Sequence, residues 1–335
     1  MTTYFYLPMT TAYKPINCLN LPYPMQSLGI LLFLLMSTAA CNNNNDSRTK
    51  GTLTANPPTV ISQLTRMIPE HPLLAWCIVP YDSVERGPAA RMKMLSELGF
   101  TQYVYDWREQ HLATFAEEIQ QAREADIQIS GVWMWIDQSS DSLGALSTAN
   151  EELLGIMEEQ GLQTQIWLGI NHNFFEAEDD AGKIAKAVEM VSYLNQRAKD
   201  IGCTLALYNH GDWFGEPDNQ LRILQELKND DIGMIYNFHH AHHQIEEFPA
   251  LLKRMQPYLW AVNLNGMQQE GPKILPIGSG ESEADMIQLL LNSDYSGPIG
   301  ILGHIEDEDV KVVLQRNLEG LSSMLKTMKI KEAGS

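Results

Sequence analysis

Short apolar runs rich in β-branched and aromatic residues alternate with longer amphipathic segments from Leu73 onward. Runs of this length are typical of buried strands, and apolar positions three and four residues apart are typical of helices with one buried face. Regular alternation of the two favours βα units around a parallel sheet. The predicted strands are Leu73–Val79, Gln102–Trp107, Ile127–Ile136, Thr164–Ile170, Thr204–Asn209, Gly233–Phe238, Leu259–Leu264 and Pro298–Leu302. The predicted helices are Ala89–Leu98, Leu112–Ala125, Glu151–Gln160, Gly182–Asp200, Asn219–Leu227, Ile245–Met255, Glu283–Leu291 and Val310–Leu325.

Eight such units are enough to close a sheet on itself, so the pattern predicts a single α/β domain, a (β/α)8 TIM barrel, over residues 59–330. An open, doubly wound sheet is the competing architecture. It is expected to carry a glycine-rich phosphate loop after its first strand. The residues at that point are Pro80, Tyr81, Asp82 and Ser83. The barrel is therefore favoured, and no nucleotide cofactor is expected.

The first forty residues have the composition of an export signal. They contain no Asp or Glu, their one basic residue is Lys14, and the apolar stretch Leu28–Met36 leads to Ala39, Ala40 and Cys41. The stretch is too short to span a bilayer, and small residues before a cysteine are typical of lipoprotein processing. Residues 1–40 are therefore predicted to be a signal peptide, with Cys41 lipidated. An ordinary cleaved secretory signal is the alternative.

The Asn-rich segment after Cys41 predicts a disordered tether over residues 41–58, between the anchor and the folded body. The expected location is the cell envelope, with membrane contact through the lipid only. Labelled palmitate should be incorporated into the wild-type protein and not into Cys41→Ser. Absence of label from the wild type would favour the plain secretory signal.

The chain is strongly acidic, with a formal net charge of −19, which becomes −20 when the leader is removed with Lys14. This charge disfavours nucleic acid and anionic membrane surfaces as partners. A neutral, diffusible substrate is expected instead. Cys77 and Cys203 fall in the first and fifth predicted strands, across the barrel from each other. No disulfide is expected between them.

Seven of the nine histidines lie at or just after four predicted strand ends. They are His172, His210, His239, His240, His242, His243 and His304. The carboxyl ends of barrel strands form the face that carries chemistry, so the clustering predicts an active site there. His242 and His243 are interpreted as surface residues that begin a helix. One of His239 and His240 is expected to serve packing, because neighbouring residues of a strand point in opposite directions.

Three of these strand-end segments resemble a known superfamily. They are Asn209-His210 after the fifth strand, the histidines after the sixth, and the turn at residues 277–281 after the seventh. In this order they resemble the xylose isomerase-like barrels, which include sugar isomerases, epimerases and apurinic endonucleases. The resemblance covers residues 73–325. It implies a sugar as substrate and a divalent metal held by Glu, Asp, His and Glu at strand ends.

The usual carboxylate set is not intact in this chain. The family's metal-binding positions fall on Tyr208, Asn237, Asn263 and His304. Two alternatives remain open. His210, His240 and His304 form a site for zinc, manganese or magnesium, because neutral imidazole suits first-row metals. Otherwise no metal binds, and the same three imidazoles act as general acid and base.

The remaining site residues are predicted from their place at loop starts and from their chemistry. Glu176 and Lys273 complete the catalytic set, because they can move protons or polarise a carbonyl. Aromatic and amide groups at strand ends suit a sugar, whose C–H faces stack on rings and whose hydroxyls need hydrogen bonds. The predicted substrate-binding residues are Asp106, Trp135, His172, Asn209, Trp213, Asn237, His239, Asn263 and Asn265.

Together these features predict an exported sugar-modifying enzyme. It would abstract a proton next to the carbonyl of a neutral sugar or keto-glycoside, a step shared by isomerisation, epimerisation and eliminative cleavage. The alternative is a non-catalytic carbohydrate-binding lipoprotein that has lost the metal site. The residues at the lost metal positions are polar, which favours the enzyme.

Overall fold

The computed structural model describes residues 59–228 and 231–328. The predicted leader, the lipidation site Cys41 and the tether lie outside the described residues, so these predictions are untested. Within the described ranges, no helix is both long and apolar enough to cross a membrane.

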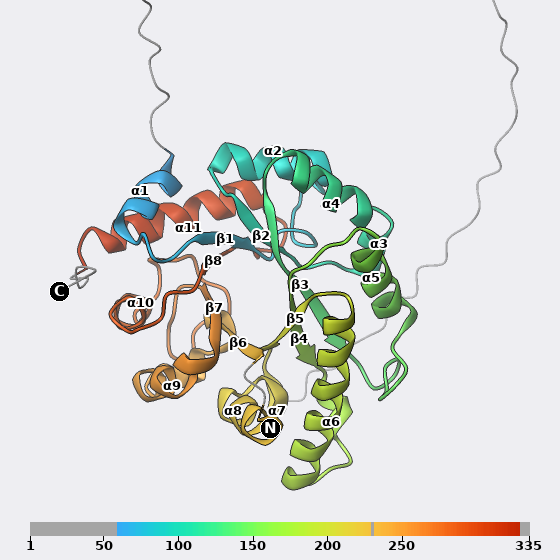
Figure 1. Ribbon diagram of the computed structural model, residues 1–335. Helices are drawn as coiled ribbons and strands as arrows, with labels where there is room; N and C mark the ends of the chain where they lie inside the picture. The colour runs from blue at the N-terminus through green and yellow to red at the C-terminus, as the bar shows by residue number, and fades with distance from the viewer. Residues whose placement is uncertain (1–58, 229–230, 329–335) are drawn as a thin grey trace, which may run out of the picture. The chain divides into compact units, whose positions relative to one another are not determined.

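Eight parallel strands close into a barrel in sequence order, from β1 through β8 and back to β1 (Figure 1). The (β/α)8 prediction is therefore confirmed. The strands are β1 (Leu73–Trp76), β2 (Gln102–Tyr105), β3 (Gln128–Ile136), β4 (Gln165–Ile170), β5 (Thr204–Tyr208), β6 (Ile232–Asn237), β7 (Leu259–Leu264) and β8 (Ile299–Leu302). The largest difference from prediction is at β1, which ends three residues early because Cys77 adopts a left-handed backbone, φ 56°.

The helices surround the strands (Figure 1). They are α1 (Val60–Met67), α2 (Pro88–Leu98), α3 (Glu109–Leu112), α4 (Phe115–Glu124), α5 (Thr148–Glu159), α6 (Asp180–Asp200), α7 (Asp212–Gly215), α8 (Pro217–Leu227), α9 (Phe248–Met255), α10 (Glu283–Leu291) and α11 (Val310–Leu325). Short 3₁₀ turns are η1 (His172–Phe175), η2 (Phe238–His240), η3 (His242–Gln244) and η4 (Gln256–Tyr258). Helix α1 was not predicted. The predicted helix at residues 112–125 corresponds to α4, and the short helix α3 precedes it and overlaps the predicted range only at Leu112.

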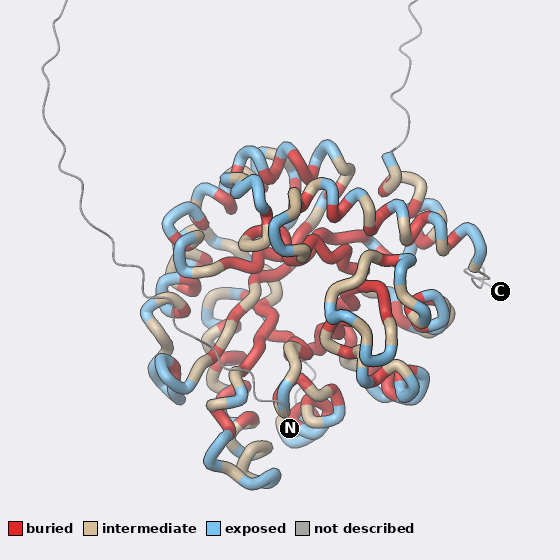
Figure 2. Tube along the Cα trace, turned by 180° about the vertical axis from the view of Figure 1, so that it is seen from behind, coloured by how far each residue is buried: buried red, intermediate tan, exposed pale blue. Residues whose placement is uncertain are grey.

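Strand side chains alternate between two cores. On β3, Val132 and Met134 pack in the layer between strands and helices, whereas Trp133 packs against the cluster inside the barrel. The same alternation places Trp135 on the inner side. Buried residues follow the strands and the inner sides of the helices, as Figure 2 shows. Cys77 and Cys203 are buried, free thiols.

Candidate functional site

Four strand-end histidines lie together at the carboxyl ends of β5, β6 and β8. Ring centroids are 4.6 Å apart for His210 and His240, 3.8 Å for His240 and His239, and 6.1 Å for His239 and His304. His210, His239, His240 and Lys273 line a cavity of about 460 Å³. His210 and His240 thus share one cavity as predicted, whereas His304 does not line it. His304 joins the cluster through His239.

The asparagine of β6 fixes the orientation of His239. The Asn237 Oδ1 atom accepts a hydrogen bond from His239 Nδ1 at 2.8 Å, and the Asn237 amide nitrogen donates to the Tyr208 hydroxyl. Because Nδ1 carries the proton, Nε2 of neutral His239 keeps its lone pair. Asn209, predicted to bind substrate, instead exchanges two hydrogen bonds with the Asn237 backbone, at 2.7 and 3.1 Å.

Burial keeps the four imidazoles neutral. It lowers the pKa of His210 and of His304 to about 4, with the charges of Lys273 and Arg108 adding to the effect. The pKa values of His239 and His240 are also lowered well below the usual range, first by burial. At neutral pH these rings are therefore uncharged, and each can accept or donate a proton.

Two cations face the cluster. The Arg108 side chain donates to the Tyr81 hydroxyl at 3.0 Å, and its guanidinium lies 5.0 Å from the centre of the Trp133 ring. Tyr81 in turn stacks on His304, with ring centroids 3.5 Å apart. Lys273 is the second cation, and it lines the cavity that contains His210, His239 and His240. Within residues 59–228 and 231–328, neither cation forms an ion pair with a carboxylate.

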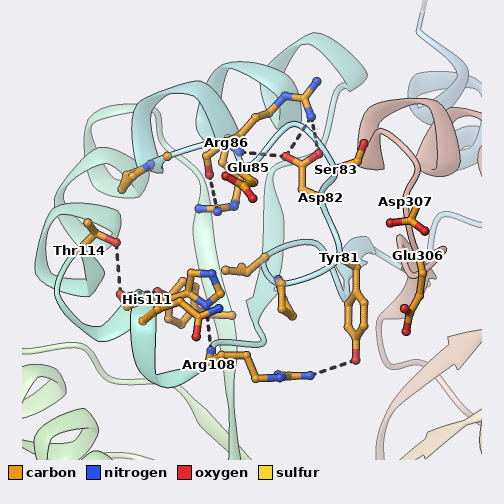
Figure 3. A pocket seen from close by; sticks show the side chains of 17 residues that line it. Tyr81, Asp82, Ser83, Glu85, Arg86, Arg108, His111, Thr114, Glu306 and Asp307 are labelled. Carbon is orange, nitrogen blue, oxygen red and sulfur yellow. Dashed lines mark hydrogen bonds and ion pairs between the residues drawn. The ribbon is translucent and has the colours of Figure 1, made fainter. Parts of the chain in front are cut away.

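Figure 3 shows the neighbouring cavity, of about 790 Å³, in which Arg108 reaches the Tyr81 hydroxyl and Glu306 lies nearby. Glu306 is also 3.8 Å from the His304 ring. Arg108 and Tyr81 thus form the boundary between this cavity and the histidine cluster. Arg108 stands in the sequence next to Asp106 and Trp107 at a loop start, which made it a pocket candidate, whereas Tyr81 was not predicted to belong to the site.

Asp106 is buried at the end of β2, as suits a predicted pocket residue. Its Oδ1 atom accepts hydrogen bonds from the amides of Ile78 and Val79, both at 3.1 Å. Burial raises its pKa to about 7, although Arg108 and the two amides act in the opposite direction. Asp106 therefore changes charge near neutral pH.

Several buried polar atoms in the upper barrel have no hydrogen-bond partner among the described residues. They are Asp106 Oδ2, His240 Nε2, Trp76 Nε1 and both side-chain polar atoms of Asn263. Unpaired buried groups cost free energy, so they mark positions where bound water or a ligand hydroxyl fits. Asn263 is fully buried and lines none of the described cavities, so its predicted role in binding stays a prediction.

The histidines do not assemble a metal site. In the part of the chain that the structure describes, no group of three or more His, Cys, Asp or Glu residues is arranged to hold a metal ion. His304 is stacked on Tyr81 and next to His239, which separates it from His210 and His240. The predicted three-histidine donor set therefore does not fit a metal in this arrangement.

Glu176 and His172 lie on the outer rim of the site and not in the cluster. They pair with each other at 3.3 Å, and their side chains are 66% and 61% exposed. His172 also approaches Asp212, which lines the histidine cavity, at 3.9 Å. The rim position gives Glu176 no contact with the buried imidazoles, in contrast to its predicted catalytic role.

Trp213 and Asn265 are used for packing and loop structure. The Trp213 ring contacts Phe175, with centroids 4.9 Å apart, and its indole nitrogen faces Asp180 of α6. Trp213 therefore faces the helical layer, in contrast to its predicted place on the substrate. Asn265 hydrogen-bonds the carbonyls of Gly266 and Lys273 and accepts from the Leu275 amide, so its amide shapes the β7 loop.

His242 fastens the loop that carries Lys273. Its Nε2 atom lies 3.0 Å from the Lys273 carbonyl oxygen, and its Nδ1 atom lies 2.9 Å from the Gln268 carbonyl oxygen. His242 thereby ties the end of β6 to the β7 loop, a contact that the sequence interpretation as a surface residue did not anticipate. His243 is exposed and pairs with Glu216, in agreement with that interpretation.

Trp135 forms the wall of the site next to His210, as predicted. The two ring centroids are 4.7 Å apart. Gly169 pairs with Trp135 in the sheet, and a Cβ atom at Gly169 would lie 2.6 Å from the indole ring. Glycine at this position therefore allows the Trp135 ring to lie across β4 toward His210.

No protein-family model matches this chain, and no curated protein is found as a relative. Solved structures do match. The alignment with L-ribulose 3-epimerase has a TM-score of 0.60 at 12% identity and covers 77% of this chain and 95% of that one. For 3-keto-D-glucoside 4-epimerase from E. coli the TM-score is 0.55 at 16% identity, covering 76% and 99%. A xylose isomerase-like TIM barrel protein from Mycobacterium smegmatis, in complex with magnesium, gives 0.51 at 16% identity, covering 77% and 97%.

The chain has the same (β/α)8 barrel fold as these structures. The resemblance seen in the strand-end motifs is thus confirmed for the fold. At these identities the likeness concerns architecture, so the chemistry of the site is argued from this chain's own residues.

Proposed function

We propose that this protein is a sugar-modifying enzyme that abstracts a proton next to a carbonyl group. The observation that carries the proposal is the arrangement of neutral, buried imidazoles beside two cations that lack carboxylate partners. Such a site suits a neutral substrate on which negative charge develops during reaction. Two matching structures are named for sugar epimerases, which supports a sugar as the substrate.

His210 is the proposed proton acceptor. Its ring is half-buried at the cavity wall and contacts Trp135 and His240. No residue that the structure describes hydrogen-bonds to the ring nitrogens, which leaves both available to substrate. The C–H bond breaks, the proton passes to an imidazole nitrogen, and the electron pair moves to the carbonyl oxygen.

Lys273 and Arg108 are placed to stabilise that enediolate oxygen. The new negative charge also offsets the cationic contribution to the lowered imidazole pKa values, so His210 becomes more basic as the reaction proceeds. Return of the proton to the neighbouring carbon gives isomerisation, and return to the opposite face gives epimerisation. Loss of an oxygen substituent on the next carbon gives eliminative cleavage of a glycoside.

Incubation of the protein with a panel of neutral keto-sugars and keto-glycosides tests the proposal. An isomer, an epimer or a released aglycone should appear in the product mixture, and the assay is run with chelator and with added zinc, manganese or magnesium. Binding without any product under all these conditions would favour the second candidate, a carbohydrate-binding barrel without catalysis. The unpaired polar atoms at Asn263 and Trp76 would serve that role equally well.

Export with a lipid anchor at Cys41 is part of the proposal. It is supported by the leader composition alone. Phosphorylated sugars are scarce outside the cytoplasm, so an unphosphorylated substrate suits this location.

A further inference from the structure

A further cavity, separate from the one in Figure 3, adjoins the histidine cluster at the ends of β2 and β3, and we call it the second cavity. Its volume is about 970 Å³, compared with about 460 Å³ for the cavity lined by the histidines. Small-molecule sites span roughly 300–1,000 Å³. The histidine cavity is therefore suited to one sugar ring, and the second cavity offers room for a further group.

Three tryptophans line this second cavity: Trp107, Trp133 and Trp135. The Trp133 and Trp135 rings are nearly parallel, with centroids 5.7 Å apart and an interplanar angle of 19°. Both rings are half-buried, and both border the cavity. Trp135 also contacts His210, so the two cavities are neighbours. We call the pair Trp133 and Trp135 the tryptophan platform.

The platform is held in place from both sides. Trp107 donates from its indole nitrogen to the Trp133 carbonyl at 2.6 Å, and the Arg108 guanidinium lies over the Trp133 ring. Gly169 leaves the space in which the Trp135 ring lies. These contacts fix the rings without a ligand, so binding on them costs little ordering entropy.

The opposite wall, the loop between β3 and α5, is also preformed. Buried Asp141 accepts hydrogen bonds from the amides of Asp137 and Ser147, at 3.0 and 2.8 Å, and from the Asn150 side chain at 3.0 Å. Leu146 from this loop lines the cavity. The second cavity therefore has one aromatic wall and one rigid wall that carries an apolar side chain.

We propose that the substrate carries a second ring, an uncharged aryl or glycosyl group, that stacks on the tryptophan platform while the reacting sugar lies at the histidines. The inference rests on the proposed function and narrows its substrate class from free keto-sugars to glycosides. Flat indole rings stack well on aryl groups and on the C–H face of a pyranose. Carboxylates of Glu109, Asp137 and Glu152 also line the cavity, which disfavours an anionic group.

Binding of matched glycoside pairs tests this inference. The full chain is titrated calorimetrically with phenyl and methyl glycosides of glucose, galactose, mannose and xylose, and with their 3-keto forms. At least one phenyl glycoside should bind about tenfold more tightly than its methyl counterpart. Trp133→Leu should remove that difference. Trp260→Leu is the matched control, because Trp260 lines a separate cavity formed by residues at the opposite ends of the strands, and the difference should persist in it.

Equal affinity within every pair, no binding by any member, or a phenyl preference that survives Trp133→Leu would each overturn the inference. The unoxidised glycosides have no carbonyl and cannot undergo the proposed reaction. Loss of the proposed function would therefore appear as absence of products from the keto forms while the phenyl preference remains.

Discussion

His210→Ala is expected to lower the rate of proton abstraction from a keto-sugar by about a hundredfold or more, the size typical of losing a general acid or base. The ring lies at the cavity wall and has no hydrogen-bond partner in the part of the chain that the structure describes, so its removal takes away a reacting group and breaks no hydrogen bond seen there. Substrate affinity should change less than turnover, because Trp135 and Lys273 still line the proposed binding region. The measurement is kcat and KM for wild type and variant, with circular dichroism to verify folding.

His71→Gln is the control for this variant. His71 stacks on Tyr295 and its Nδ1 atom lies 3.1 Å from the Gly297 carbonyl oxygen, just before β8. It lies at the end of the barrel opposite the histidine cluster, and its replacement should leave kcat near the wild-type value. Equal turnover in wild type and His210→Ala would remove His210 from the mechanism.

Acidification is expected to destabilise the folded barrel steeply between pH 6.5 and pH 4. The folded-state pKa values of His210 and His304 are lowered to about 4, and those of His239 and His240 are lowered well below the usual value. The unfolded chain therefore binds more protons in this window, and the free energy of unfolding falls as the pH falls.

Asp106 acts in the opposite direction. Its folded-state pKa is raised to about 7, so the folded state binds the extra proton between about pH 4 and pH 7, and this term becomes more stabilising as the pH falls. The loss of folding stability from the four histidines is expected to exceed the gain from the single Asp106 carboxyl group. Even with His304 discounted for solvent screening, we expect a net loss of stability from pH 7 to pH 5.

Urea unfolding at pH 7 and pH 5 measures this loss. His240→Gln should reduce it, because one neutral buried imidazole is removed. Asp106→Asn should increase it, because the opposing carboxyl group is removed. A free energy of unfolding that stays constant or rises from pH 7 to pH 5 would contradict the buried, neutral state of the cluster.

The fold was predictable because its signals are local. Apolar runs such as Gln165–Ile170 and Leu259–Leu264 are short and bounded by polar residues, and β7, α10 and α11 match their predicted bounds. Helix α1 was missed although Val60, Leu64 and Met67 have helical spacing, because the alternating pattern was taken to begin only at Leu73. The division of α3 from α4 was also missed, because Ala113 and Thr114 do not interrupt a helical pattern strongly.

The candidate site was predictable only where a residue's position along its barrel strand determines which residues surround it. His210, His239, His240 and His304 follow their strands directly, and they meet at the mouth. Loop residues depend on the path of the loop. Trp213 follows Asp212, whose backbone is left-handed with φ 54°, and its side chain packs toward α6. The Arg108 side chain turns back to the Tyr81 hydroxyl.

Asn209 and Asn265 show a related limit. An asparagine at a strand end has the same sequence signature whether it binds a ligand or satisfies neighbouring backbone groups. Both here satisfy backbone groups, whereas the side chain of Asn263, two residues before Asn265, has no hydrogen-bond partner among the described residues. The difference is set by tertiary contacts between β5, β6, β7 and their loops, which single-strand patterns do not contain.

The most direct test of the proton-abstraction mechanism is the mass of the keto-sugar or keto-glycoside recovered after incubation with the wild-type protein in deuterated water. The mechanism predicts deuterium at the carbon next to the carbonyl in at least one substrate of the panel, with His210→Ala losing the exchange. The mechanism would be contradicted if the sugars bind but are recovered uncleaved and without deuterium, both with and without added zinc, manganese or magnesium.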